Sequence, residues 1–328
     1  MQRMKIVIDT KGGDKGAEAM IRGAAKTLEK FDELDALLVG DETDIQRYCQ
    51  SLNLPSDRYE ILHAPGEITN YDHPAEALFR KTDSSMLRGL SALSERQDLI
   101  GLITAGNTGV LITGAMRYLS GKERVRPSLA AVLPCQDGSF TCLVDTGATI
   151  DCTPAMLHHF ARLGSEFMRN MYGIERPKIG LLSNGAEESK GNKLVKETYP
   201  LLKEDDSLNF VGNVEGNVAL SGCCDVLVCD GFAGNQVLKV TEGTATRMIT
   251  DIMKYAHRTG SSEVKQLAAH LMSIYDIGSL GGGIILGVEK TVIKVRGSAG
   301  EDAVVNTAEM ILNLAQHKSV FDQKRNQV

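Results

Sequence analysis

The stretch MKIVIDTKGGD (residues 4–14) decides the fold class of this chain. Its first half is an apolar run typical of a buried strand. Its second half is a small-residue turn, followed by a helical pattern that starts at about Gly16. The same unit of apolar run, turn and longer helical pattern recurs along the sequence. Because parallel strands need long connections between them, this rhythm predicts a parallel sheet with crossover helices.

The other predicted strands are equally apolar, which indicates how the sheet is covered. Strands that are apolar on both sides are typical of a sheet with helices on both faces. We therefore predict an α/β fold, with a mostly parallel sheet in a Rossmann-like three-layer architecture. The further predicted strands lie at residues 36–41, 59–64, 99–105, 129–134, 140–145, 178–183, 209–214 and 225–230. The longer helical patterns begin near Thr43 and His73 and span residues 154–171, 192–203 and 234–256.

The sequence draws no clean domain boundary. It contains no repeat of fixed period, no low-complexity tract and no Pro- or Ser-rich linker. We predict a single α/β domain over residues 4–316, or two tightly joined lobes of it. A polar C-terminal tail over residues 317–328 is expected to follow.

Composition and charge exclude several classes of protein. The 328 residues are 42% hydrophobic and 24% charged, which is typical of an ordered globular protein. No apolar run approaches the roughly 18 residues that span a bilayer, and no signal-peptide pattern precedes the first strand, so we expect a cytoplasmic protein. With 36 basic and 42 acidic side chains the net charge is −6, which argues against nucleic acid as a partner.

The seven cysteines are an odd number without C-x-x-C spacing. Most of them lie within apolar runs, so we expect buried thiols in a reducing compartment. No pair of histidines accompanies Cys223, Cys224 and Cys229 to complete a zinc tetrahedron. We predict no metal site.

Turns rich in Gly, Asn and Asp follow several of the predicted strands. In an open parallel sheet these turns collect at the carboxyl edge of the strands, where α/β proteins bind ligands. Glycines let the backbone approach an anion, and helix N-termini add free N–H donors and partial positive charge. The recurrence therefore predicts an anion-binding site. The turns lie at residues 8–14, 104–109, 144–151, 182–192 and 229–235.

Motifs for nucleotide and hydrolase chemistry are missing from the sequence. It has no G-x-x-x-x-G-K-[ST], G-x-G-x-x-G, G-x-S-x-G or H-E-x-x-H pattern. ATPases, simple dinucleotide-binding enzymes, serine hydrolases and zincins are therefore disfavoured, and no cofactor is expected.

Two residues in these turns are candidates for catalysis. Lys190 lies in a loop between Gly185 and Gly191, where an ammonium group can hold phosphate or a developing oxyanion. Asn235 follows Gly234 near a helix start and can donate a side-chain N–H. By spacing alone, Lys190 is equally compatible with a solvated loop residue and Asn235 with a helix N-cap.

The order and wording of the turns resemble the PlsX family, the acyl-[acyl carrier protein]:phosphate acyltransferases of bacterial phospholipid synthesis. KIVIDTKGGD is similar to the D-A-M-G-G-D opening of that family. The resemblance extends over nearly the whole chain. The further blocks, in order, are TAGNTG with RPSLAAVLP, VDTGATIDCTP, LSNGAEESKGN, NFVGNVEG, CDGFAGNQVLK and GGGIILG.

The resemblance implies both a reaction and a site. Inorganic phosphate would attack the thioester of a long-chain acyl carrier protein, giving acyl phosphate without metal or nucleotide. The implied fold is related to the phosphotransacetylase and isocitrate-dehydrogenase-like folds. Lys190 and Asn235 are the implied catalytic residues. The implied substrate-binding residues are Asp9, Gly12, Gly13, Asn107, Thr108, Gly109, Asp145, Gly191, Asn192, Asp230, Gly234 and Arg296.

The chain departs from the family pattern in several turns. Lys11 replaces the usual Met of the opening turn, and residues 145–149 and 185–188 differ from the usual wording. The largest departure is Arg296, which stands where the family pattern has His. Arg keeps a fixed positive charge that His carries only part of the time. Phosphate binding would survive this change, whereas a proton-transfer role at this position would not.

Partners follow from the same resemblance. An acyl carrier protein is acidic and needs a local basic surface, for which we predict Arg117, Lys122, Arg124 and Arg126. The family resemblance also implies a homodimer, a helical protrusion in the last third at residues 242–275, possible peripheral membrane contact and a downstream glycerol-phosphate acyltransferase. The apolar stripes of this protrusion favour dimer contacts over lipid contacts.

Two other functions stay open at this point. One is a phosphotransacetylase that uses coenzyme A thioesters, because it shares the architecture and the phosphate chemistry. The other is a regulatory homologue that binds phosphate or acyl groups but has impaired turnover, which Arg296 would favour. A dehydrogenase of related fold is disfavoured because no acidic metal cluster is evident.

Overall fold

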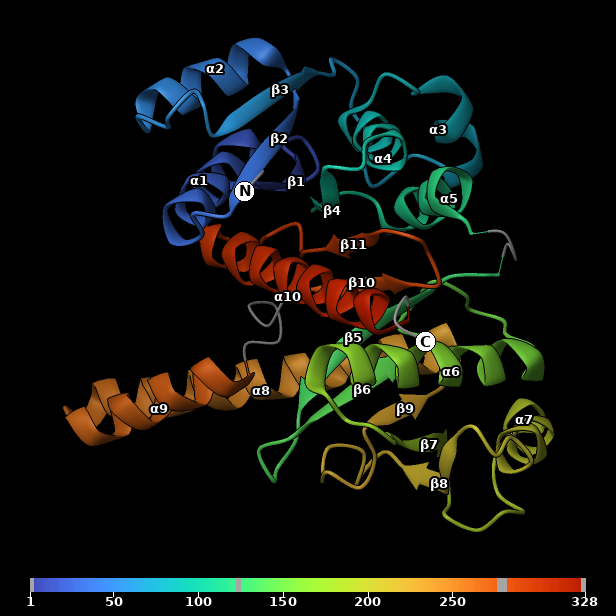
Figure 1. Cartoon of the computed structure of the whole chain (residues 1–328). Coiled ribbons are helices and arrows are strands. Elements are labelled where there is room, and N and C mark those ends of the chain that lie inside the picture. Colours follow the sequence, from blue (N-terminus) through green and yellow to red (C-terminus); the bar gives the residue numbers. More distant parts are fainter. Residues whose placement is uncertain (1–2, 122–124, 276–281, 326–328) are drawn as a thin grey trace. The chain divides into compact units, whose positions relative to one another are not determined.

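The computed structural model describes residues 3–121, 125–275 and 282–325, with side chains up to Gln316 (Figure 1). The chain divides into two compact units. Unit 1 is Met1–Pro127 with Gly278–Val328, and unit 2 is Ser128–Ile277. In each unit helices pack on a sheet, so the predicted α/β class is confirmed. The single domain over residues 4–316 stays a prediction.

The sheet of unit 1 is parallel apart from one strand. Its strands are β1 (Met4–Asp9), β2 (Leu34–Gly40), β3 (Tyr59–His63), β4 (Leu99–Thr104), β10 (Gly283–Leu286) and β11 (Thr291–Lys294). They lie in the order β3-β2-β1-β4-β11-β10, and only β10 is antiparallel to its neighbour β11. The carboxyl ends of β1, β4 and β11 therefore lie at one edge.

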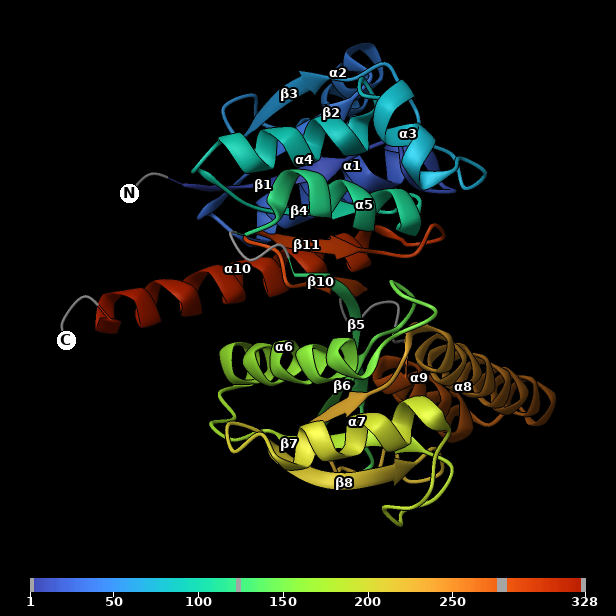
Figure 2. The ribbon, with the colours of Figure 1, turned by 90° about the vertical axis from the view of Figure 1, so that its right-hand side faces the viewer.

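Helices cover both faces of this sheet (Figure 2). Adjacent residues of β4 contact helices on opposite sides. A Cβ on Gly89 would lie 3.0 Å from Leu102, whereas a Cβ on Gly101 would lie 2.6 Å from Ile311. Glycine thus permits close packing on each side. The helices of unit 1 are α1 (Gly16–Lys30), α2 (Glu42–Ser51), α3 (Pro74–Arg80), α4 (Ser85–Glu95), α5 (Thr108–Leu119) and α10 (Glu301–Arg325).

The long helix predicted from His73 is wrong, because the structure forms α3 and α4 with a break between them. Thr82, Asp83 and Ser84 are poor helix formers, and Ser84 adopts an extended φ/ψ of −68° and 150° at the start of α4. Lys81 Nζ donates to Asp72 Oδ2 at 2.7 Å and to the Glu67 carbonyl at 2.9 Å. These contacts tie the break to the preceding loop.

The sheet of unit 2 begins with a hairpin. Its strands are β5 (Ser128–Pro134), β6 (Phe140–Val144), β7 (Lys178–Ser183), β8 (Asn209–Glu215) and β9 (Val226–Val228), in the order β5-β6-β9-β7-β8. β5 and β6 are antiparallel and the other pairs are parallel. The predicted sheet is therefore mostly parallel, as expected.

Four helices complete unit 2: α6 (Pro154–Tyr172), α7 (Lys193–Lys203), α8 (Gly231–Thr259) and α9 (Ser262–Tyr275). α6 packs on the face that carries Val226, because a Cβ on Gly164 would lie 2.6 Å from that side chain. The first turns of α8 pack on the opposite face, against the cluster that contains Leu227. Beyond these turns α8 pairs with α9, which matches the helical protrusion expected in the last third of the chain.

The C-terminal helix is longer than the sequence predicts. The backbone of α10 is helical to Arg325 and so continues through most of the stretch where the polar tail is expected.

Among the described residues, none of the helices combines the length and the apolar character that a membrane span requires.

Candidate active site

The predicted site residues fall into two sets, one in each unit. They lie at the carboxyl ends of strands, in the loops that follow or in the first turns of the next helices, as the sequence predicts. The set of unit 1 is Asp9, Gly12, Gly13, Asn107, Thr108, Gly109 and Arg296. The set of unit 2 is Asp145, Lys190, Gly191, Asn192, Asp230, Gly234 and Asn235.

Asp9 is a buried carboxyl at the end of β1. It is 1% exposed and receives hydrogen bonds from Thr104 Oγ1 at 2.7 Å and from the amide of Lys11 at 3.1 Å, and Ser85 adds a side-chain hydrogen bond. Burial raises the pKa of Asp9, and these hydrogen bonds oppose the rise. Asp9 therefore organises the loop rather than facing a ligand as an open charge.

Three loops meet at this edge of unit 1. A Cβ on Gly12 would lie 2.6 Å from the Gly106 amide, so only glycine lets the β1–α1 and β4–α5 loops approach this closely. The amide of Asp14 donates to the Gly297 carbonyl at 2.8 Å, which joins the β11–α10 loop. Arg296 directly precedes Gly297 and is half-buried. The structure thus brings Arg296 to the loop that carries Gly12 and Gly13.

Asn107 caps α5 and is fully engaged. Its Oδ1 accepts from the amide of Val110 at 3.1 Å, and its Nδ2 donates to the carbonyls of Thr69 at 3.1 Å and Asp72 at 3.3 Å. A Cβ on Gly109 would lie 2.7 Å from Pro74. These residues hold the start of α5 against the loop before α3, which is a structural task at the predicted position.

Asp145 follows β6 in unit 2 and is 0% exposed. Its Oδ1 accepts from the amides of Leu129 at 2.9 Å, Gly147 at 3.2 Å and Ala148 at 3.1 Å, and its Oδ2 accepts from Thr149 at 2.6 Å. Burial raises the pKa of this carboxyl, and the backbone N–H donors oppose the rise. Asp145 thus shapes the 145–149 loop from within.

The start of α8 packs directly on that loop. A Cβ on Gly234 would lie 1.9 Å from the Asp145 carbonyl oxygen, which no larger residue allows. Asp230 caps the helix, because its Oδ1 accepts from the Ala233 amide at 2.8 Å. Asn235 is therefore not the N-cap; it lies in the second turn, where its Nδ2 donates to the Thr146 carbonyl at 3.1 Å.

Lys190 belongs to a loop with its own internal hydrogen bonds. The amide of Gly191 donates to Asn184 Oδ1 at 2.9 Å, and Asn213 Nδ2 donates to the Glu187 carbonyl at 2.8 Å. The Lys190 side chain lies over Gly185, where a Cβ would be 2.7 Å from its Cγ. Lys190 is exposed, and within the described part of the chain its ammonium has no hydrogen bond or ion pair.

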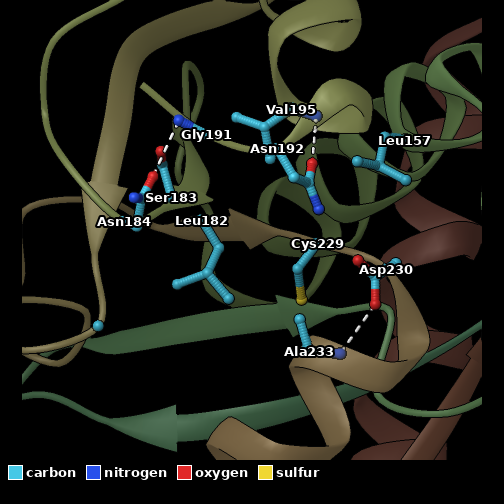
Figure 3. Close-up of a pocket in the computed structure, with 11 residues that line it drawn as sticks. Leu157, Leu182, Ser183, Asn184, Gly191, Asn192, Val195, Cys229, Asp230 and Ala233 are labelled. Atoms are coloured by element: carbon cyan, nitrogen blue, oxygen red, sulfur yellow. Dashed lines mark hydrogen bonds between the residues drawn. The ribbon is translucent and has the colours of Figure 1, made fainter. Parts of the chain in front are cut away.

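A pocket of about 570 Å³ opens at the carboxyl ends of β7 and β9, next to this loop (Figure 3). The starts of α7 and α8 flank it. Asn192 caps α7 by accepting from the Val195 amide at 2.9 Å, and Asp230 caps α8. The lining residues are Leu157, Leu182, Ser183, Asn184, Gly191, Asn192, Val195, Gly216, Cys229, Asp230 and Ala233.

The charges around the pocket are unequal. The Asp230 carboxylate lies at the α8 side and repels an anion, whereas Lys190 directly precedes Gly191 at the α7 side. The first amides of α7 add partial positive charge there, since an N-cap side chain satisfies only part of the free donors of a helix. An anion is therefore favoured on the α7 side. Neither Lys190 nor Asn235 is among the residues that line this pocket; Lys190 adjoins the lining residue Gly191, and Asn235 lies two residues after Ala233.

The sequence did not identify the apolar residues that line the pocket. It also did not identify some polar side chains near the predicted site residues. Leu157 and Cys229 line the pocket but sit in apolar runs that look like ordinary core. Thr104 Oγ1 donates a hydrogen bond to Asp9, although the two residues are 95 positions apart in the sequence. No local sequence pattern predicts this pair. Ser183 lines the pocket, and its buried Oγ has no hydrogen-bond partner among the described residues. The only sequence feature that indicates Ser183 as a site residue is its position at the end of an apolar strand.

The predicted carrier-docking cations are only partly described. Arg117 is engaged: Nη1 donates to the Leu78 carbonyl at 3.1 Å, and its guanidinium lies 5.6 Å from the centroid of the Phe79 ring. Arg126 is exposed. Lys122 and Arg124 lie outside the described residues. Over the described ranges, no three His, Cys, Asp or Glu side chains gather closely enough to hold a metal ion.

Sequence comparisons place this chain in a family. A sequence profile described as "Fatty acid synthesis protein" matches residues 4–320. A phosphate acyltransferase of Halothermothrix orenii is 37% identical over 315 residues, covering 94% of this chain and 93% of that protein. One of Streptococcus pneumoniae is 36% identical over 329 residues and covers 98% of each. The chain belongs to this phosphate acyltransferase family. Membership confirms the family and the acyltransferase class predicted from the motifs.

Solved structures resemble this phosphate acyltransferase family member in fold. A phosphotransacetylase from Streptococcus pyogenes has a TM-score of 0.65 at 17% identity, covering 97% of this chain and 94% of that one. A 4-hydroxythreonine-4-phosphate dehydrogenase from Klebsiella pneumoniae has a TM-score of 0.55 at 12% identity, covering 96% and 100%. The predicted relation to the phosphotransacetylase fold is therefore confirmed.

Proposed function

We propose that this enzyme transfers a long-chain acyl group from an acyl carrier protein thioester to inorganic phosphate. An oxygen of hydrogen phosphate attacks the thioester carbonyl carbon, and the C–S bond breaks. The sulfur of the carrier leaves with the proton that phosphate carried, and acyl phosphate forms. Phosphate is already a nucleophile, so positioning and charge stabilisation suffice for the step.

The observation that carries this proposal is the pocket of unit 2, whose lining combines the start of α7 with aliphatic side chains. The start of α7 favours an anion at one end, where Lys190 directly precedes the lining residue Gly191. Leu157, Leu182 and Val195 form an apolar wall beside it. Acyl transfer to phosphate needs both surfaces within one site, and the family membership supports the same reaction.

We assign Lys190 to the phosphate or to the tetrahedral oxyanion, because its ammonium is exposed and unengaged among the described residues. Asn235 would orient the acyl carbonyl or phosphate. One N–H of its amide already donates to Thr146, which fixes the side chain and leaves the second N–H for substrate. Gly191, Asn192, Asp230 and Gly234 would shape the pocket around them.

In unit 1, substrate contacts are likewise our proposal. Gly12 and Gly13 expose backbone at the loop edge, and Thr108 lies in the first turn of α5. Arg296 would add a permanent positive charge for phosphate, which the usual His supplies only when protonated. Asp9, Asn107, Gly109 and Asp145 would act by shaping these loops.

The decisive experiment supplies hexadecanoyl-carrier protein and phosphate and traps acyl phosphate with hydroxylamine. Lys190→Ala should lower kcat/KM by about a hundredfold or more, because a contact to developing charge is lost. Lys196→Ala removes the same charge from an exposed position on α7 and should change little. No acyl phosphate from the wild type with any thioester would refute the proposed function and favour a binding module.

The donor is tested in the same assay. A carrier protein thioester should react far faster than the matching coenzyme A thioester; the reverse order would indicate a phosphotransacetylase. Replacing both Arg124 and Arg126 with Glu should raise KM for the acidic carrier without raising KM for phosphate. An unchanged KM for the carrier would exclude docking at these residues.

For the assembly we propose a homodimer through α8 and α9. Apolar side chains along this helix pair are exposed. Met248→Glu should yield monomers in light scattering, and cosedimentation of the wild type with anionic vesicles tests the alternative of peripheral membrane contact. Use of the product by a downstream glycerol-phosphate acyltransferase stays a prediction from the family. The exposed side chains are Val240, Met248, Met253, Tyr255, Leu267, Met272 and Tyr275.

A further inference from the structure

The pocket of unit 2 has one aliphatic side whose role the reaction alone does not assign. Leu157 comes from α6, Leu182 from β7, Val195 from α7 and Ala233 from α8, so four elements contribute aliphatic side chains to the lining of the pocket (Figure 3). Leu157 is only 1% exposed. Cys229 completes this side, and burial raises the pKa of its thiol well above the ordinary value, so it is uncharged at neutral pH. The surface is therefore apolar and without ionised groups.

We propose that this aliphatic side binds the acyl chain and that the side chains at positions 157, 182, 195 and 233 limit its length. The proposal rests on the proposed function, because it assumes an acyl thioester substrate. The amides of a pantetheine arm would find no hydrogen-bond partners on this wall, and burying them unpaired is costly. Methylene groups lose nothing there and gain from leaving water. We therefore favour the acyl chain over the pantetheine arm as the group that occupies this part of the pocket.

Close packing holds the side chains that line this pocket in place. Val195 packs on Gly191, where an added Cβ would lie 2.3 Å from Val195 Cγ1. Leu182 and Ala233 pack against the core cluster that contains Cys229 and Leu227. Because protein cores are close-packed, a larger side chain at position 233 fills the pocket instead of displacing its walls. The pocket volume of about 570 Å³ falls in the range of about 300–1,000 Å³ that ligand sites occupy.

The polar rim orients the chain relative to the reacting carbon. Gly191 and Asn192 lie at the α7 end of the pocket, beside the anion-binding position assigned above. A chain that extends along Leu182 and Leu157 would leave its carbonyl near this rim. The hydroxyl of Ser183, which has no partner among the described residues, lies at the same end of β7. The apolar wall and the phosphate position are thus consecutive parts of one pocket.

The test compares hexadecanoyl and butanoyl carrier protein as donors for wild type, Ala233→Leu and Ala155→Leu. Ala233→Leu should lower the ratio of kcat/KM for hexadecanoyl over butanoyl by at least about tenfold, because the filled pocket excludes only the long chain. Ala155→Leu makes the same change at an exposed position of α6 outside the pocket and should leave the ratio at the wild-type value.

A second variant covers the case in which Ala233→Leu does not fold, as judged by circular dichroism. Leu157→Ala enlarges the pocket and should raise the relative kcat/KM of a methyl-branched chain over the straight chain of equal length. An unchanged ratio, or an equal loss for both donors in a folded variant, overturns the chain-binding assignment while the transferase stands. A wild type inactive with every donor overturns the proposed function instead.

Discussion

Asp9 and Asp145 occupy equivalent places, each at the carboxyl end of a strand in its own unit, yet they are held by different donors. Asp9 is held mainly by the hydroxyls of Thr104 and Ser85. Asp145 is held by backbone amides alone, those of Leu129, Gly147, Ala148 and Thr149. A hydroxyl can donate or accept, whereas an amide N–H can only donate. The loop of unit 1 should therefore tolerate a neutral side chain, and the loop of unit 2 should not.

The largest effect is expected for Asp145→Asn. An amide can present only one oxygen, so its NH2 group would face a backbone N–H that Asp145 accepts at 2.6 to 3.2 Å. We expect a loss of about 3 kcal/mol in the free energy of unfolding, since a buried donor loses its charged acceptor. Urea unfolding with an unchanged m-value would measure it. If the free energy of unfolding falls no more for Asp145→Asn than for Asp9→Asn, the expected difference between the two aspartate loops is wrong.

A somewhat smaller effect is expected for Gly234→Ala, which tests how tightly α8 packs on the Asp145 loop. The added Cβ would meet the Asp145 carbonyl oxygen at 1.9 Å, so the backbone must shift at a cost of about 2 kcal/mol. Gly243→Ala is the matched control on the same helix, where nothing lies within 4 Å of the added Cβ. It should stabilise by up to about 1 kcal/mol. Equal effects of both changes in thermal unfolding would show that the close approach is unimportant.

The smallest effect is expected for Asp9→Asn, about 1 kcal/mol at pH 4, because hydroxyl partners can reorient. Burial raises the folded pKa of Asp9 above its ordinary 3.8, so the folded state keeps a proton that the unfolded chain has already lost. This contribution to stability is complete below pH 3.8 and is lost as the pH rises through the folded pKa. The penalty of Asp9→Asn should thus shrink toward pH 7. A penalty that grows with pH would reverse the sign and exclude a raised pKa.

Much of the fold was predictable because each apolar run and each helical pattern is local. The β5–β6 hairpin is the instructive exception. Six residues or fewer separate the two runs, too few for a crossover helix, and the turn contains Asp137 and Gly138, with Gly138 at φ 84°. The short turn indicated a hairpin, but the alternation of strands and helices along the chain favoured a parallel arrangement. The break between α3 and α4 was likewise predictable from the poor helix formers Thr82, Asp83 and Ser84.

The candidate site was predictable to a lesser degree. The glycine-rich turns predict a ligand-binding edge, because their composition indicates a backbone that must approach another group closely, and anion binding there stays a prediction. The roles of single residues did not follow from composition. Asn192 and Asp230 are helix caps, Asn235 is not, and Asp145 is sealed beneath its loop. Each role depends on which donor from a distant segment reaches the side chain.

By itself the sequence determined the alternation of strands and helices, the family, and the turns that carry the chemistry, since all of these are written in neighbouring residues. Tertiary structure alone decided that Leu157, Leu182, Val195 and Ala233 line one pocket. It also decided that two similar aspartates receive different donors. The physical reason is that local sequence sets backbone preference, whereas burial, packing and hydrogen-bond partners arise only when segments far apart in the chain come into contact.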